Sequence, residues 1–179
     1  APERRRDPTA YYGHTSGVGI ALAEADPDAS VGIGGLGVGT VACYRKPGQA
    51  WTFYEIDPRV ARYSRDGTFT FVSDCAPDSR IVIGDARLEL AAEPPASFDI
   101  LVIDAFTSDA IPMHLLTQEA FDTYGRVLSD DGVLLLHISN RFIDLAPMVS
   151  ALAQAGGWVG RQRSDLEDLG EGLTASEWI

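Results

Sequence analysis

Five short apolar runs alternate with stretches of helical periodicity along the chain. The apolar runs lie at residues 31–34, 51–55, 81–83, 100–103 and 133–138. The helical patterns cover residues 40–44, 58–64, 86–92, 117–128 and 144–155. Strands that are apolar on both faces and alternate with helices indicate a parallel sheet covered on both sides. We therefore predict an α/β fold with a doubly wound, mostly parallel sheet.

This alternation divides the chain into two parts. Residues 1–30 are rich in Pro, Gly and Asp and hold one apolar stretch at 19–23, so we expect an N-terminal arm that could serve as a lid. Residues 31–179 form the predicted Rossmann-like domain. The last residues, Ser176-Glu177-Trp178-Ile179, resemble the opening of a final strand, which we expect to be truncated.

Composition narrows the class of partner. With 179 residues, 45% of them apolar and 22% charged, the chain fits one globular domain. A net charge of −12 argues against a nucleic-acid partner and suits a cationic substrate. No apolar run reaches the roughly 18 residues of a membrane span, and the N-terminus lacks the apolar stretch of a signal peptide. We expect no membrane insertion by this chain.

The two cysteines, Cys43 and Cys75, lie far apart in the sequence without CxxC spacing. This pattern does not predict a zinc site. We expect two unpaired cysteines and a reducing, cytoplasmic compartment.

A glycine-rich turn follows the first strand and contains Gly35, Gly37 and Gly39. Glycines let the backbone approach a ligand closely and can begin a helix whose N-terminus faces that ligand. In a doubly wound sheet the ligand crevice lies outside the carboxyl ends of the strands, where this turn stands. Glycine clusters also make ordinary turns, so the turn alone is weak evidence.

Acidic residues follow the next three strands. Glu55 lies roughly 20 residues after the glycines, where a carboxylate can accept hydrogen bonds from both hydroxyls of a ribose. Asp57 is expected to cap the helix that begins at residue 58. Asp85 could cap the next helix or accept a hydrogen bond from an adenine amino group, and Asp104 ends the fourth strand. Together with the glycine turn, these acids predict a site for an adenosyl ligand.

A dinucleotide site is the competing interpretation. Gly32, Gly34 and Gly37 match the spacing GxGxxG, but the preceding strand would then come from residues 25–30, Ala-Asp-Pro-Asp-Ala-Ser, which is not strand-like. A frame beginning at Gly35 follows a proper strand but has Thr40 where the third glycine belongs. We therefore favour S-adenosylmethionine or its decarboxylated form over NAD or FAD.

Several motifs resemble the polyamine aminopropyltransferases (spermidine synthases), especially the spermidine-synthase-like domains of bacteria. They are Tyr11-Tyr12-Gly13-x-x-Ser16-Gly17, Gly35-Leu36-Gly37-Val38-Gly39-Thr40, Tyr54-Glu55-Ile56-Asp57-Pro58, Gly84-Asp85-Ala86-Arg87, Phe98-Asp99-x-Leu101-Val102-x-Asp104-Ala105-Phe106, Ser108-Asp109-Ala110-Ile111-Pro112-x-His114-Leu115-Leu116-Thr117 and Asp131-Gly132-Val133-Leu134-x-x-His137-Ile138-Ser139-Asn140-Arg141. The glycine turn and Glu-Ile-Asp-Pro are shared with many methyltransferases. The segment from Asp104 to His114 is far more specific.

The resemblance implies a transferase of polyamine biosynthesis with the Rossmann-like fold of S-adenosylmethionine-dependent methyltransferases. Such an enzyme moves an aminopropyl group from decarboxylated S-adenosylmethionine to a di- or polyamine such as putrescine, without a metal. Asp104 would face the acceptor amine, and a carboxylate there can bind the ammonium and then take its proton. The expected cofactor-binding residues are Gly35, Gly37, Gly39, Glu55, Ile56, Asp85 and Ala86. The expected substrate residues are Asp109, His114 and Tyr12.

Three departures keep other functions open. Val38 stands where the family usually has an acid in the glycine turn, Thr107 stands where it has a second Asp, and the usual N-terminal β-hairpin domain is missing. Methyl transfer to a small molecule and adenosyl-ligand binding without catalysis are the alternatives. A homodimer also stays open. We expect His137, inside the last predicted strand, to be an interior histidine with its hydrogen bonds satisfied.

Overall fold

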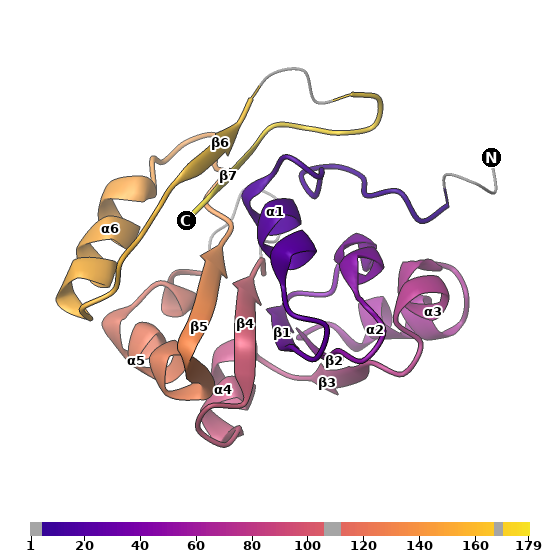
Figure 1. Ribbon diagram of the computed structural model, residues 1–179, viewed down its shortest axis with the longest axis horizontal. Helices are drawn as coiled ribbons and strands as arrows, with labels where there is room; N and C mark the ends of the chain where they lie inside the picture. Colours follow the sequence, from indigo (N-terminus) through magenta and orange to yellow (C-terminus); the bar gives the residue numbers. More distant parts are fainter. Residues whose placement is uncertain (1–4, 106–111, 167–169) are drawn as a thin grey trace.

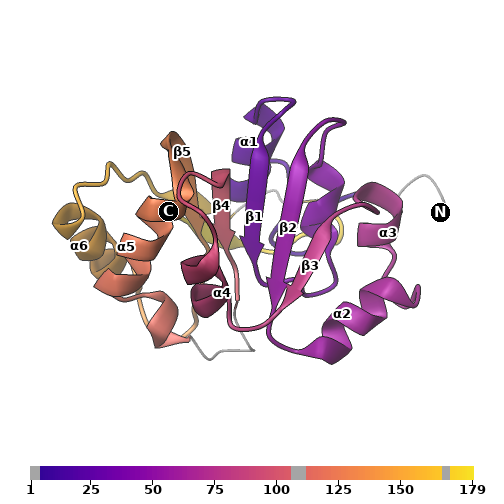
Figure 2. The same ribbon diagram turned by 90° about the horizontal axis from the view of Figure 1, so that it is seen from below.

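The computed structural model describes residues 5–105, 112–166 and 170–179. Its centre is a sheet of five parallel strands in the order β3-β2-β1-β4-β5. Figure 2 shows these strands side by side. The strands are β1 (Ser30–Gly34), β2 (Ala50–Glu55), β3 (Arg80–Ile83), β4 (Phe98–Ile103) and β5 (Leu128–Leu136). The predicted doubly wound parallel sheet is confirmed.

Helices cover both faces of the sheet (Figure 1). They are α1 (Gly17–Glu24), η2 (Thr40–Tyr44), α2 (Pro58–Arg65), α3 (Phe71–Cys75), α4 (Ala86–Ala92), η3 (Met113–Leu115), α5 (Gln118–Val127) and α6 (Ala146–Ala155), where η marks a 3₁₀ helix. Along β4, Ile100 and Val102 pack with α1, η2, α2 and α3, whereas Leu101 and Ile103 pack with α4, α5 and α6. This alternation follows from the period of two along a strand. Both faces of the sheet are therefore core.

Side chains at the helix starts explain several boundaries. Asp57 accepts a hydrogen bond from the N–H of Arg59 and caps α2, as predicted, and Pro58 takes the first helical position. Thr117 caps α5 in the same way. The helix expected at residues 40–44 is a short 3₁₀ helix, and α3 was not anticipated from the sequence.

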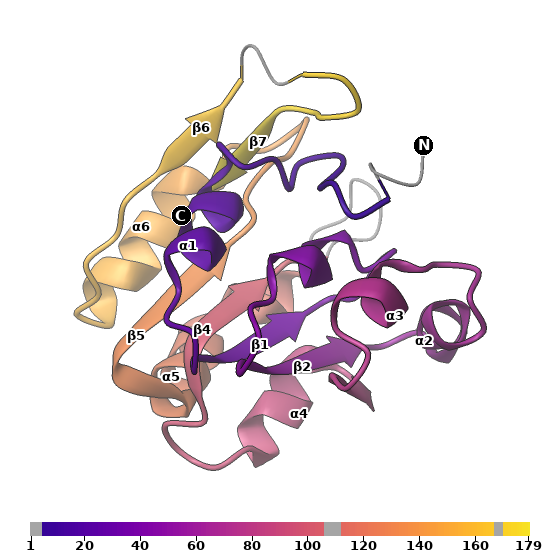
Figure 3. The same ribbon diagram turned by 45° about the vertical axis from the view of Figure 1, so that its right-hand side comes forward.

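A two-stranded antiparallel ribbon of β6 (Arg163–Asp165) and β7 (Ser176–Trp178) lies beyond β5 (Figure 3). Main-chain hydrogen bonds join Leu136 to Ile179 in both directions, and the N–H of Ile138 donates to the carbonyl of Glu177. The ribbon therefore continues from the far edge of the sheet. It brings Trp178 next to the end of β5.

The expectation of two unpaired cysteines is wrong, because Cys43 and Cys75 form a disulfide. The two residues are 32 positions apart in sequence, but η2 and α3 lie against each other and bring their Cα atoms to 4.9 Å. Disulfides are rare in reducing compartments. The cysteines therefore no longer support a cytoplasmic location, which stays a prediction. Within the described ranges, no helix combines the length and the hydropathy needed to cross a bilayer.

Candidate active site

A cavity of about 400 Å³ opens at the carboxyl ends of the parallel strands. Its walls come from the N-terminal arm, the glycine turn and the residues that follow β2, β3 and β4. This is the edge at which doubly wound sheets bind ligands. Of the residues predicted for the site, those lining the cavity are Tyr12, Gly35, Gly37, Glu55, Ile56, Asp85, Ala86, Asp104 and His114.

The three glycines of the turn have different surroundings. Gly35 has a φ of +107°, and a Cβ there would collide with the main-chain carbonyl of Asp104. Gly37 has a φ of +53° and open space where a Cβ would stand. Gly39 lies outside the cavity lining, and a Cβ there would contact Val72. The turn is thus packed against the end of β4 at Gly35 and open to the cavity at Gly37.

Glu55 is held by the main chain of two neighbouring loops. Its Oε2 accepts from the N–H of Leu36 at 3.1 Å, and its Oε1 accepts from the N–H of Asp57 at 2.9 Å. The residue is 9% exposed and lines the cavity. A carboxylate has about four acceptor positions, so two remain for further donors such as ribose hydroxyls. Next to it, Ile56 is 64% exposed and offers the cavity an apolar surface.

Asp85 both caps a helix and contacts a predicted substrate residue. Its Oδ1 accepts from the N–H of Leu88 at the start of α4, so the capping role is confirmed. Its Oδ2 lies 2.7 Å from Nε2 of His114. Ala86, the first residue of α4, is buried beside it. The structure therefore pairs His114 with Asp85 in the lining of the cavity.

Asp104 receives two side-chain hydrogen bonds. Tyr12 donates its hydroxyl to Oδ2, and Nδ1 of His137 lies 2.8 Å from Oδ1. The side chain of Asp104 is only 3% exposed. Burial and the negative charge of Asp104 raise the pKa of Tyr12 well above its usual range. Tyr12 therefore stays protonated and keeps its hydrogen for Asp104.

His137 is the site residue whose partner sequence reasoning missed. It is buried and hydrogen-bonded, as expected of an interior histidine, but its partners are Asp104 and Ser139. The sequence showed only that Asp104 follows the apolar run at residues 100–103 and that His137 lies near the end of the run at residues 133–138. The contact between the two side chains arises because β4 and β5 are neighbouring strands with Ile103 opposite Leu136.

Two further predictions concern Asp109 and metal binding. Asp109, expected to line the substrate pocket, lies outside the described residues. Among the described residues, no group of three or more His, Cys, Asp or Glu side chains is arranged to hold a metal ion.

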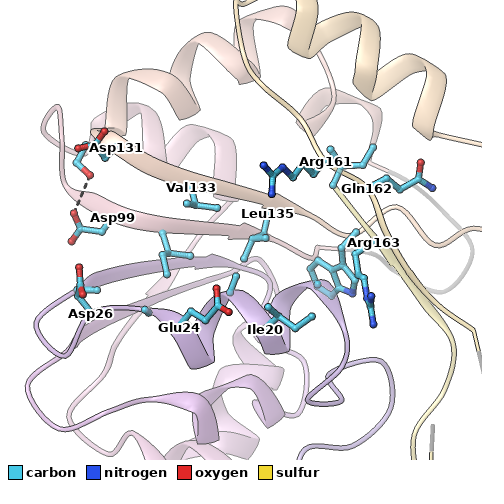
Figure 4. Close-up of a pocket in the computed structure, with 18 of the residues that line it drawn as sticks. Ile20, Glu24, Asp26, Asp99, Asp131, Val133, Leu135, Arg161, Gln162 and Arg163 are labelled. Carbon is cyan, nitrogen blue, oxygen red and sulfur yellow. Dashed lines mark hydrogen bonds between the residues drawn. The ribbon is translucent and has the colours of Figure 1, made fainter. Parts of the chain in front are cut away.

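A larger cavity of about 830 Å³ is lined by residues of α1, of β5 and of the β6–β7 ribbon. Figure 4 shows its acidic end at Asp26, Asp99 and Asp131 and its basic end at Arg161 and Arg163. Asp99 is occupied with fold-stabilising contacts, since it accepts from the N–H of Ser30 and from the hydroxyl of Ser129. Neither the glycine turn nor any acid that follows a strand lines this cavity. We therefore place the candidate active site at the carboxyl edge.

Comparisons with known proteins find similar sequences and similar folds. No family model matches the chain. A polyamine aminopropyltransferase of Vibrio vulnificus is 30% identical over 107 residues, which cover 59% of this chain and 35% of that protein. An N-terminal histidine N-methyltransferase of Emericella nidulans is 31% identical over 121 residues, 65% of this chain and 21% of that protein. The crystal structure of a probable spermidine synthase from Corynebacterium glutamicum superimposes with a TM-score of 0.74 at 23% identity, covering 98% of this chain and 64% of that one.

The resemblance to the polyamine aminopropyltransferases is confirmed. The fold is the Rossmann-like fold of S-adenosylmethionine-dependent methyltransferases, which spermidine synthases share. Both curated relatives are transferases. The chain spans about a third and about a fifth of their lengths. The activity of the whole proteins is therefore carried over only as a proposal.

Proposed function

We propose that this chain is an aminopropyltransferase domain that moves an aminopropyl group from decarboxylated S-adenosylmethionine to a di- or polyamine such as putrescine. The proposal rests on the position of the Asp104 carboxylate. This carboxylate is buried, accepts a hydrogen bond from the hydroxyl of Tyr12, and lines the same cavity as Glu55 and Asp85. An acceptor amine bound there would stand beside an adenosyl donor held by the strand ends.

The donor would be bound along the edge formed by β1, β2 and β3. Glu55 has acceptor positions left for the ribose hydroxyls, and Asp85 lies at the next strand end, where it would face the adenine. Ile56 would pack on the adenine ring through its exposed apolar side chain. Gly37 leaves room for close approach of the donor to the turn.

The proposed reaction uses Asp104 as general base. An ammonium group of the acceptor gives one proton to the carboxylate, so that an O–H bond forms as the N–H bond breaks. The freed nitrogen lone pair attacks the aminopropyl carbon next to the sulfonium. The new C–N bond forms as the C–S bond breaks, and the sulfur leaves as neutral methylthioadenosine. The negative charge of the site favours a cationic acceptor throughout.

Methyl transfer is the second candidate, because Val38 is 41% exposed in the glycine turn at the position where the family has an acid. A valine cannot bind the amino group of an aminopropyl donor as a carboxylate would. The relative from Emericella nidulans is itself a methyltransferase.

The experiment that separates the two candidate functions incubates the protein with each donor and a panel of amines and measures the masses of the products. Addition of an aminopropyl group supports the proposal, and addition of a methyl group overturns it in favour of the second candidate. Tight binding of adenosyl ligands without any product would indicate a binding domain.

A further inference from the structure

His137 contacts the proposed base directly, although the proposed reaction gives it no role. Asp104 is the residue after β4, and His137 is the residue after β5. Ile103 and Leu136 are register partners, and the N–H of His137 donates to the carbonyl of Ile103 at 3.1 Å. The two side chains therefore emerge from adjacent strands at the same level of the sheet.

The hydrogen bonds around the ring define where its hydrogen lies. Nδ1 is 2.8 Å from Oδ1 of Asp104, and Nε2 is 2.8 Å from Oγ of Ser139. The N–H of Glu177 donates to the same Oγ at 2.8 Å, which leaves the hydroxyl hydrogen of Ser139 free to point at Nε2. An ionised Asp104 can only accept, so Nδ1 must carry a hydrogen.

Two aromatic rings hold the imidazole in place. Tyr11 stacks on it with centroids 4.3 Å apart, and Trp178 stacks on it with centroids 4.6 Å apart. One ring face accommodates one stacked ring, so Tyr11 and Trp178 lie on opposite faces. Tyr11 comes from the N-terminal arm and Trp178 from β7, so distant parts of the chain fix one side chain.

The order Ser139, His137, Asp104 is also that of a hydrolytic triad, in which the serine attacks the substrate. Here the carboxylate, and not the serine, faces the cavity. Asp104 lines the cavity at the strand ends, and Ser139 lines neither that cavity nor the larger one between α1 and the β6–β7 ribbon. Ser139 therefore anchors the ring, and the ring acts on the carboxylate.

We propose that His137 is a positioning residue for Asp104. This inference rests on the proposed function, in which Asp104 is the base. A donor fixed at Oδ1, together with Tyr12 at Oδ2, sets the plane of the carboxylate and the direction of its remaining lone pairs. Misplacing a reacting group by 1 Å can cost about 10²-fold in rate. The effect of His137 should therefore fall on turnover, because the ring does not line the cavity around Asp104.

Three variants test this role. His137→Asn keeps a donor at the position of Nδ1, since both nitrogens are bonded to Cγ. His137→Leu removes the donor. His14→Leu is the matched control, because His14 is an exposed histidine of the N-terminal arm. Among the ring contacts of the described residues, the ring of His14 meets only the edge of the Tyr44 ring. We expect kcat to fall by about 10²-fold in His137→Leu and to recover to within about 5-fold of wild type in His137→Asn. The KM for the amine and the affinity for methylthioadenosine should change little.

A nuclear magnetic resonance measurement on ¹⁵N-histidine-labelled protein tests the same inference without turnover. The chain has three histidines, so the ring of His137 is identified by the signals that disappear in His137→Asn. We expect a protonated Nδ1 in wild type. An unprotonated Nδ1 would require the hydrogen of the Nδ1–Oδ1 bond to sit on Asp104, which would then not be a base, and would overturn the inference.

Equal loss of turnover in the Asn and Leu variants, or full turnover in the Leu variant, would also overturn it. If His137→Leu fails to fold, the Asn variant and the ring signals still decide. If wild type transfers no aminopropyl group at all, the proposed function fails. The protonation of Nδ1 then still shows whether His137 holds an ionised Asp104.

Discussion

Gly35 lies so close to the main chain of Asp104 that any side chain at residue 35 would collide with the carbonyl oxygen of Asp104. The N–H of Asp104 in turn donates to the carbonyl of Gly34 at 2.8 Å. The glycine turn and the proposed base are therefore positioned by one another. The absence of a side chain at residue 35 is a requirement of packing, independent of any ligand.

This contact predicts that Gly35→Ala is more destabilising than Gly37→Ala. Both glycines have positive φ, but a Cβ at Gly37 would meet open space. We expect Gly37→Ala to lower the free energy of unfolding by about 1–2 kcal/mol, the cost of a left-handed alanine, and Gly35→Ala to lower it further. Denaturant unfolding of the two variants measures the difference. Equal losses would show that the turn is not packed against Asp104.

Glu55→Ala is expected to weaken binding of methylthioadenosine by about 1–3 kcal/mol, through loss of hydrogen bonds to the ribose. Titration calorimetry measures this loss. Glu24→Ala, which removes an exposed carboxylate of α1, is the control and should bind normally. Because Glu55 also accepts from two main-chain N–H groups, unfolding of the ligand-free variants must be compared. Unchanged affinity in a folded Glu55→Ala would remove Glu55 from the site.

The pKa of Tyr12 predicts how its contribution to stability depends on pH. Burial raises this pKa above the value of about 10 in the unfolded chain, so the folded state holds the proton more tightly. The difference in unfolding free energy between wild type and Tyr12→Phe should be constant from neutral pH to about 9 and should shrink above about 10. A difference that grows with rising pH would contradict the hydrogen bond from Tyr12 to Asp104.

Reduction of the Cys43–Cys75 disulfide should destabilise the protein. Closing a loop of this length, with a sequence separation of 32, is worth about 3–4 kcal/mol through the entropy of the unfolded chain. Unfolding with and without a reducing agent measures the effect, and the Cys43→Ser, Cys75→Ser double variant, which cannot form the bond, is the control. If the reducing agent changes the stability of wild type no more than that of the double variant, the bond is not formed in solution.

The parts of the fold predictable from sequence are those that depend on local pattern. The apolar runs predicted the strands, and the ends of those runs predicted Glu55, Asp85 and Asp104, because a strand end is visible in the sequence. The pairing of Cys43 with Cys75 was missed because α3 is five residues long and has no visible periodicity. The contact of His137 with Asp104 depends on strand order, and its stacking on Trp178 depends on a ribbon that returns to β5. Such contacts between distant segments carry no local signal.

The most direct test of the account is the turnover of Asp104→Asn with decarboxylated S-adenosylmethionine and putrescine. The substitution keeps the shape of the side chain and removes its charge and its basicity. We predict that turnover falls by roughly 10²–10⁴-fold, while the unfolding midpoint and the affinity for methylthioadenosine stay close to those of wild type. Normal turnover by a folded Asp104→Asn protein would contradict the central claim that Asp104 is the base.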